Sequence, residues 1–321
     1  MEKGDRSILS EDNERKRTNL QEDKIDLSPF SQVADRLLHP LTPIPTGFPA
    51  RISPMQPRAV IFDIYGTLLI SAAGDVGPDS AKDDEQAFLQ ALVDGGWDPA
   101  LVHEKGTSLL QEEIHAVHRE KRAQGVRFPE IDILRIWHRV LIRLGLLTEG
   151  ENRIIIKKIR LTAVSYECRT NPVWPMPGLL ETLAGLRAKG FLFGILSNAQ
   201  FYTPILFEML CNQSLTELGF DPKLCLFSYR EGEGKPAPNL FSRLNRRLGA
   251  RGIKSSEILY VGNDMLKDIR PAAEIGWKTA LFAGDNRSLR LREEEPYLQD
   301  VQPTLVIDDL RQLLDVAVSR P

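Results

Sequence analysis

The chain has 321 residues, of which 42% are hydrophobic and 26% charged, a balance typical of a globular protein with a sizeable buried core. Its formal net charge of -3 gives no sign of a nucleic-acid partner. The cysteines Cys168, Cys211 and Cys225 are too few and too far apart for a disulfide framework or a zinc site. No apolar run is long enough to cross a bilayer and no secretory signal is present, so we expect a cytoplasmic protein without a membrane partner.

The N-terminal part of the chain differs in composition from the rest. Residues 1–28 carry many charges of both signs and almost no apolar side chain, so they cannot bury enough surface to offset the entropy of ordering them. A short helix fits residues 29–38, because proline is tolerated in a first helical turn. Several prolines between positions 40 and 57 then favour an extended connector. We expect residues 1–57 to form a disordered or extended leader.

A strand that ends in an aspartate organises the rest of the chain. Residues 59–62 (Ala-Val-Ile-Phe) are apolar, Asp63 follows them directly, and a Gly66-Thr67 turn comes next. This pattern is typical of a buried strand with a polar side chain at its carboxyl end. Ligands of open parallel α/β sheets bind at that end, so Asp63 is a candidate catalytic residue. The alternative is that Asp63 only caps the turn.

The pattern changes from strand to helix between Ser71 and Asn171. Helices are expected over residues 83–93, 99–122, 130–144 and 152–168, separated by glycine-containing breaks. A helical block of this length, inserted after the first strand, predicts an α-helical cap domain over residues 75–172, above the carboxyl edge of the sheet. We expect the cap to close the site and to select the substrate.

Charged side chains of the cap offer two kinds of site. His115 and His118 lie three apart on one helix, a spacing that favours an ordinary solvated face over a metal site. Arg122, Arg127 and Arg135 are candidates for contacts with an anionic substrate.

From residue 174 onwards strands and helices alternate, which is the signature of a parallel sheet. Strands are expected at residues 191–196, 224–227, 258–261, 278–282 and 304–307. Together, residues 58–74 and 173–318 therefore predict an α/β core, a Rossmann-like, doubly wound parallel sheet.

Polar residues follow three of these strands. Ser197 and Asn198 can donate hydrogen bonds to an oxyanion, or they can cap the next helix. Lys235 stands between a glycine-rich loop and a proline, which can hold a cation at the mouth of the sheet; a surface lysine is the alternative. Asp264 and Asp268 straddle a strand-to-helix turn and can direct oxygens at a hard cation such as magnesium, or one of them can be a helix cap.

These groups occur in the order of the four motifs of the haloacid dehalogenase-like hydrolases: Asp63 with Thr67, Ser197-Asn198, Lys235-Pro236, and Gly262-Asn263-Asp264 with Asp268. The chain resembles this superfamily over about residues 58–310. Its helical insertion resembles the cap of the subgroup that holds both small-molecule phosphatases and haloacid dehalogenases.

The resemblance implies a role for each residue at the strand ends. Asp63 would be the nucleophile that forms an aspartyl intermediate, and Lys235 would neutralise charge on Asp63 and on the substrate. Ser197 would bond a substrate oxygen with support from Asn198, and Thr67 would also contact the substrate.

The resemblance also implies a bound magnesium ion. Its ligands would be Asp63, the backbone carbonyl of Tyr65, and the acidic residues of the last motif, Asp264 and Asp268. The chemistry agrees, because two anions such as carboxylate and phosphate approach each other only when cations offset their repulsion.

Two positions depart from the pattern of the phosphatases. Tyr65 replaces the aspartate that protonates the leaving alkoxide, and tyrosine is a poor acid at neutral pH because its reference pKa is about 10. Tyrosine at this position resembles the true haloacid dehalogenases, whose halide leaving group needs no proton and which need no metal. Asn263 stands where phosphatases commonly have their first aspartate, and Asp264 either takes over that role or only neighbours it.

We therefore expect a magnesium-dependent hydrolase of a small phosphorylated metabolite. One alternative is a 2-haloacid dehalogenase, which would release halide without magnesium. Another is a catalytically weak protein that binds its small-molecule ligand without turnover.

Overall fold

A six-stranded sheet forms the centre of the computed structural model, which describes residues 27–74, 84–148 and 152–316. The strands, all parallel, lie in the order β5 (Phe220–Phe227), β4 (Leu192–Ser197), β1 (Ala59–Phe62), β6 (Ile258–Gly262), β7 (Lys278–Phe282) and β8 (Leu305–Ile307). The first strand, β1, thus lies in the middle of the sheet, and the later strands are added on both sides of it. The predicted doubly wound α/β core is confirmed, and the strand order reverses beside β1, where ligands of such sheets bind.

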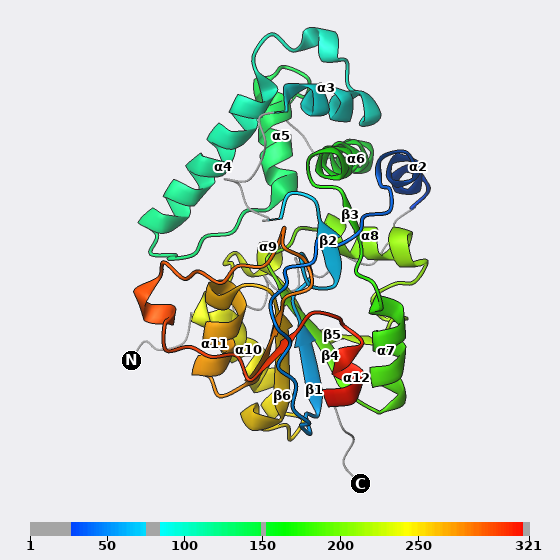
Figure 1. The fold of residues 1–321 in the computed structure, drawn as a ribbon. Helices are drawn as coiled ribbons and strands as arrows, with labels where there is room; N and C mark the ends of the chain where they lie inside the picture. The colour runs from blue at the N-terminus through cyan, green and yellow to red at the C-terminus, as the bar shows by residue number, and fades with distance from the viewer. Residues whose placement is uncertain (1–26, 75–83, 149–151, 317–321) are drawn as a thin grey trace.

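Helices cover both faces of this sheet (Figure 1). One side carries α7 (Leu179–Ala188), α8 (Tyr202–Cys211) and α12 (Gln312–Val316); the other carries α10 (Pro238–Gly249) and α11 (Arg270–Glu274). A one-turn helix, α9 (Ser228–Glu231), follows β5. Because both faces are buried, the strands are apolar along their length instead of alternating.

Between the short antiparallel strands β2 (Leu69–Ser71) and β3 (Val173–Pro175), the chain forms a helical layer beyond the end of the sheet (Figure 1). Its helices are α3 (Glu85–Asp94), α4 (Gly106–Ala123), α5 (Ile133–Arg143) and α6 (Arg153–Thr170). Residues 99–101 form a separate short turn, so the segment expected as one helix from residue 99 is broken before α4. We propose that α3 to α6 constitute the cap domain.

The helical layer has an aromatic core of its own. Phe88 of α3 stacks on Trp137 of α5 with ring centroids 5.1 Å apart, and Tyr166 of α6 packs edge-on against both rings. Side-chain caps fix where three helices begin, because Asp84, Asp132 and Asn152 each accept a hydrogen bond from a first-turn amide. None of the described helices is long and apolar enough to cross a membrane.

Part of the expected leader packs against the body of the protein, while residues 1–26 lie outside the described residues. Helix α2 (Ser28–Leu37) contacts α6 and α8 and buries Phe30. Further on, Ile44 donates its backbone N–H to Asp285, and Arg51 pairs with Val306 at the edge of the sheet. The extended segment is therefore held by hydrogen bonds, which cannot be predicted from amino-acid composition.

The packing of α2 can be tested by truncating Phe30, which is 1% exposed. Phe30→Ala should lower the free energy of unfolding by about 3 kcal/mol, because a buried aromatic ring is lost and a cavity is left. The exposed Gln32→Ala on the same helix is the control and should leave stability within about 0.5 kcal/mol. Urea unfolding measures both, and equal midpoints would show that α2 does not pack as described.

Asp94, at the end of α3, joins three helices. Its carboxylate lies 2.6 Å from Arg36 of α2 and 3.0 Å from Arg169 of α6, and Ser165 donates to it at 2.5 Å. Burial alone would raise the pKa of Asp94, but the bonds from Ser165 and Arg36 and the charge of Arg169 together lower it. A lowered carboxyl pKa means that the ionised form stabilises the fold, so this contribution is present above about pH 4 and is lost as the pH falls through the folded pKa.

Asp94→Asn should therefore destabilise the protein at neutral pH, and the difference from the wild type should shrink as the pH is lowered below about 4. Asp35→Asn, at an exposed position of α2, is the matched control and should change stability little at any pH. Denaturant unfolding across pH measures the difference. A stability loss for Asp94→Asn that is independent of pH would contradict this account.

Candidate active site

A buried ammonium group between two carboxylates forms the centre of the site. Lys235 places its Nζ 2.6 Å from Oδ1 of Asp63 and 2.5 Å from Oδ1 of Asp268. The side chains of Lys235, Asp63 and Asp268 are 3%, 9% and 1% exposed, so water screens these charges very little. We call this group the carboxylate–ammonium cluster. It joins the end of β1, the loop after β5 and the segment after β6, which are far apart in sequence.

The two carboxylates keep Lys235 charged. Burial alone would lower the pKa of its ammonium group, but the negative charges of Asp268 and Asp63 outweigh burial and raise that pKa. Burial raises the pKa of Asp268 to about 6, although Lys235 acts against the rise. The cluster therefore presents a fixed cation beside Asp63, at the edge of the sheet where ligands are expected.

Asn198, directly after β4, holds the loop that carries Lys235. The backbone N–H of Lys235 donates to Oδ1 of Asn198 at 2.6 Å, and Nδ2 of Asn198 donates back to the carbonyl of Lys235 at 3.3 Å. Tyr260 of β6 also binds the ammonium group. Its hydroxyl accepts from Nζ of Lys235 at 3.2 Å and donates to the carbonyl of Leu196 at 2.8 Å. Ser197 is 1% exposed, and its hydroxyl faces the carbonyl of Asn198 at 3.5 Å.

The turn after β6 is built around Asp268. Its Oδ2 accepts from the backbone N–H groups of Asn263 at 3.1 Å and Asp264 at 3.0 Å. A Cβ on Gly262 would lie 2.5 Å from Cγ of Asp268, so only glycine allows the carboxylate to sit so close to the strand. Residues 265–269 then form a single π-helical turn.

Both carboxylate oxygens of Asp264 have partners within the protein. Its Oδ1 caps the turn by accepting from Leu266 and Lys267, at 2.8 Å and 3.1 Å. Its Oδ2 lies 2.7 Å from Nη2 of Arg292. Burial would raise the pKa of Asp264, but Arg292 and Lys267 together lower it. Asp264 thus serves here as a helix cap and an ion-pair partner.

Thr67 and Asn263 bind each other in this structure. The Thr67 hydroxyl donates to Oδ1 of Asn263 at 3.0 Å, and Nδ2 of Asn263 donates to the carbonyl of Ser288 at 2.5 Å. Thr67 is fully buried, which places its hydroxyl against the last motif instead of in open space. Gly66 permits this contact, because its φ of +79° suits glycine and a Cβ there would lie 2.4 Å from Cβ of Ser288.

The Tyr65 hydroxyl is hydrogen-bonded to Thr203 of α8, at 2.8 Å. Burial, followed by the charge of Glu167, raises the pKa of the Tyr65 hydroxyl well above its ordinary value. A hydroxyl held in its protonated form is a poor proton donor at neutral pH. The structure therefore gives no acid at this position to replace the missing aspartate.

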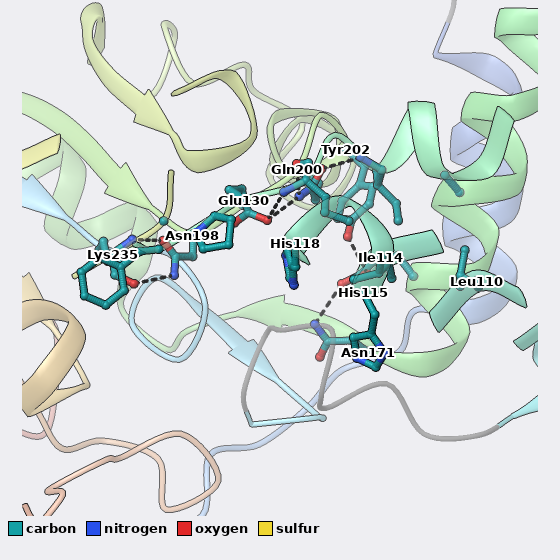
Figure 2. Close-up of a pocket in the computed structure, with 18 of the residues that line it drawn as sticks. Leu110, Ile114, His115, His118, Glu130, Asn171, Asn198, Gln200, Tyr202 and Lys235 are labelled. Atoms are coloured by element: carbon teal, nitrogen blue, oxygen red, sulfur yellow. Dashed lines mark hydrogen bonds between the residues drawn. The ribbon is translucent and has the colours of Figure 1, made fainter. Parts of the chain in front are cut away.

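Two hollows meet at the cluster. The smaller, of about 40 Å³, is lined by residues that include Asp63, Tyr65, Asn263, Asp264 and Asp268. The larger, of about 640 Å³, lies between the cap helices and the core, and both hollows are lined by Asn198, Lys235 and Lys267. Figure 2 shows the larger cavity, with Lys235 and Asn198 at one end.

The charged cap residues singled out from the sequence separate into two groups. His115, His118, Arg122 and Arg127 line the larger cavity. Arg135 is instead 83% exposed beside Asp132, at 3.7 Å. The position of each arginine in the folded protein, which the sequence does not show, determines whether it can face a substrate.

The oxygen atoms around the smaller hollow are of the kind that magnesium prefers. They include the carboxylates of Asp63, Asp264 and Asp268 and the amide oxygen of Asn263. Within the described ranges, however, no group of three or more histidine, cysteine, aspartate or glutamate side chains converges closely enough to hold a metal. The residues fit the ion in kind, and Asp264 would have to leave Arg292 to reach it; Arg292 is partly exposed, so its long side chain has room to turn outward.

The family of haloacid dehalogenase-like hydrolases matches residues 57–276, more than half of the chain, so the chain belongs to this family of hydrolases. It is similar to a glyceraldehyde 3-phosphate phosphatase of Methanopyrus kandleri, with 27% identity over 260 residues that cover 81% of this chain and 96% of the relative. It is also similar to a phosphoglycolate phosphatase of Pseudomonas fluorescens, with 25% identity over 272 residues that cover 84% and 83%. A solved 2-haloacid dehalogenase from Pseudomonas syringae pv. Tomato DC3000 covers 82% of this chain and 98% of its own at 20% identity, with a TM-score of 0.49.

Several residues that build the site carry no signal in the sequence. Tyr260 lies inside an apolar strand, Arg292 lies in a charged loop, and Glu167 lies on a cap helix. Each is recognisable only through a partner distant in the chain: Tyr260 binds Lys235, Arg292 binds Asp264, and Glu167 binds Tyr202.

The cluster makes a prediction about stability. Lys235→Met leaves two buried carboxylates without their cation and should cost about 3 kcal/mol of unfolding free energy at neutral pH. Adding Asp268→Asn removes one of those charges and should restore part of the loss, whereas the exposed Lys278→Met should have little effect. Denaturant unfolding of the single and double variants measures the coupling; strictly additive losses would show that the groups do not interact.

Proposed function

We propose that this protein hydrolyses phosphate monoesters of small metabolites by way of a covalent aspartyl-phosphate at Asp63. The observation that carries the proposal is the Asp63 carboxylate, held 2.6 Å from a buried ammonium at the switch point of the sheet, beside a cavity of about 640 Å³. The names of the relatives in Methanopyrus kandleri and Pseudomonas fluorescens support a phosphorylated substrate.

In the first step Asp63 attacks the phosphorus atom, the bond from phosphorus to the leaving oxygen breaks, and the leaving group departs with the electron pair of that bond. In the second step water attacks the same phosphorus, and inorganic phosphate and free Asp63 result. Lys235 offsets the charge that accumulates on the phosphoryl oxygens and on Asp63, while Asn198 holds the backbone of Lys235 in place.

We further propose a magnesium ion at the smaller hollow, held by Asp63, the backbone carbonyl of Tyr65 and acidic oxygens of Asp264 or Asp268. When bound, the ion supplies positive charge that lets a phosphate dianion approach a carboxylate. Magnesium should bind to the protein in calorimetric titrations, and Asp264→Asn should weaken binding more than Asp300→Asn, an exposed position. Equal affinities for the two variants would contradict a role for Asp264.

The nature of the leaving group should control the rate. Tyr65 offers no proton to a departing alkoxide, and general acid catalysis is worth about 10²–10⁴-fold. Aryl and acyl phosphates, whose leaving groups need no proton, should therefore turn over at least about 10²-fold faster than alkyl phosphates. Steady-state kinetics with p-nitrophenyl phosphate and an alkyl phosphate measure the ratio, with Asp63→Asn as the inactive control. Equal rates for the two substrates would refute this assignment of Tyr65.

A 2-haloacid dehalogenase is the second candidate, and specific observations favour it. Tyr65 matches a halide leaving group, Asn263 stands where phosphatases commonly have an aspartate, and Lys235 offsets part of the charge on Asp63 and Asp268. A panel of phosphate esters and 2-haloacids, each with magnesium or a chelator, distinguishes the two activities.

Water labelled with oxygen-18 gives an independent answer. In a single turnover the phosphatase route puts the label into phosphate, because water attacks phosphorus. The dehalogenase route puts it into the side chain of Asp63, because water attacks the carboxyl carbon of the ester. Saturable ligand binding with neither product would identify a binding protein.

A further inference from the structure

The larger cavity has two chemically different ends. Lys235 and Lys267 line it from the core, where the phosphoryl group of a substrate belongs, and Arg127 of the cap lines it beside Phe128, whose carbonyl accepts from Gly234. In Figure 2, Asn171 and His115 lie at the opposite end, well away from Lys235. A substrate that reaches both ends is held by its phosphate at one and by a different group at the other.

Glu167 of α6 lies at that opposite end and lines the cavity. Its Oε2 accepts from the Tyr202 hydroxyl at 2.8 Å, and its Oε1 accepts from Nδ2 of Asn171 at 3.0 Å. Burial raises the pKa of the Glu167 carboxyl, and these two hydrogen bonds only partly oppose the rise. Both partners are neutral, so they orient the carboxylate without balancing its charge.

No ion pair that the structure gives for the described residues includes Glu167. The contrast with Asp94 on the neighbouring helix is informative, because Asp94 is neutralised by Arg36 and Arg169. Glu167 is half-buried, so its charge is partly withdrawn from water and a cation beside it would be favourable. Since Glu167 faces a cavity, a ligand can supply that cation.

Glu130, Gln200 and His118 lie between the two ends (Figure 2), and much of the remaining lining is apolar. The side chains that form it include Leu110, Ile114, Ile131, Ile133 and Trp137. A cavity of about 640 Å³ lies within the range for drug-sized ligands, which is larger than a phosphorylated three-carbon compound requires. The body of the substrate is therefore expected to be extended and partly apolar.

Resting on the proposed function, we infer that Glu167 is a specificity-determining residue that binds an ammonium group of the substrate, at the end of the cavity opposite Lys235. The substrate class is then a phosphate monoester with an extended, partly apolar body and a distal amine. A hydroxyl group would also donate to Glu167, but it brings no charge and binds less tightly. A distal carboxylate is repelled.

His118 and Arg122 of α4 also line this cavity. Arg122 is near the C-terminal end of α4, one helical turn beyond His118, and Leu110 and Ile114 precede both. Arg122 thus lies at the end of α4 that precedes the loop carrying Arg127, whereas His115 lies with Asn171 at the far end of the cavity (Figure 2).

The test uses the full-length protein and phosphate esters of matched chain length, from four to eight carbons, that end in an amine, a hydroxyl, a methyl or a carboxylate. Each is measured as a competitive inhibitor of p-nitrophenyl phosphate hydrolysis, which avoids reliance on their own slow turnover. The phosphate ester that ends in an amine should bind at least about tenfold more tightly than the one of equal length that ends in a methyl group. The ester that ends in a carboxylate should bind least tightly.

Glu167→Gln keeps the shape of the side chain and one acceptor oxygen for Tyr202 or Asn171, but it removes the charge. The ratio of amine to methyl affinity should then fall close to one, whereas Glu120→Gln, at an exposed position of α4, should preserve the ratio. Thermal unfolding of each variant verifies that it is folded.

Failure of this inference is distinguishable from failure of the proposed function. Hydrolysis of p-nitrophenyl phosphate without any preference for the amine, or a preference that survives in Glu167→Gln, overturns the role of Glu167 alone. If no phosphate ester is hydrolysed, calorimetric titration of the same esters decides: amine-selective binding lost in Glu167→Gln supports the subsite, and unselective binding or none overturns it.

Discussion

The whole site depends on one interaction, the buried ammonium of Lys235 between the carboxylates of Asp63 and Asp268. Three charged groups taken out of water are stable only if they neutralise one another at short range and find further hydrogen bonds. Asp268 finds them in the backbone amides after β6, and Lys235 finds one in Tyr260. The result is the carboxylate of Asp63, the proposed nucleophile, held beside a fixed positive charge that can attract an anionic substrate.

The register of the sheet brings the three groups of this interaction together. Strands β1 and β6 are neighbours in register, Phe62 beside Val261, so the residues that follow them emerge side by side at the same edge. The loop after β5 brings Lys235 to the same edge because Asn198, after β4, binds its backbone in both directions. Two close approaches within the site, at Gly66 and Gly262, are made by glycine.

Much of this arrangement could be predicted from the sequence, because apolar runs that end in polar residues are a local pattern. The strands at 258–261 and 278–282 were expected at almost the bounds that the structure gives, and the family is confirmed. Short strands such as β2 and β3 could not be found, because three residues carry no usable periodicity. The packing of α2 was also missed, since composition says nothing about a partner surface such as α6.

Side-chain partners were the least predictable part of the site. Asp264 could have been a metal ligand or a cap, and its choice of Arg292 depends on a loop 28 residues further along the chain. Likewise, the bonding of Glu167 to the neutral side chains of Tyr202 and Asn171 is visible only in the folded protein. Such facts belong to three-dimensional packing, where a single neighbouring charge changes what a carboxylate does.

The central claim is that Asp63 becomes covalently attached to the substrate. Acid quenching during turnover of an aryl phosphate, followed by borohydride reduction and peptide mass spectrometry, tests it directly, because borohydride reduces an aspartyl-phosphate to homoserine. The account predicts homoserine at position 63 in the wild type and none in Asp63→Asn. Full turnover with unmodified aspartate at position 63, or with the adduct on a different residue, would contradict it.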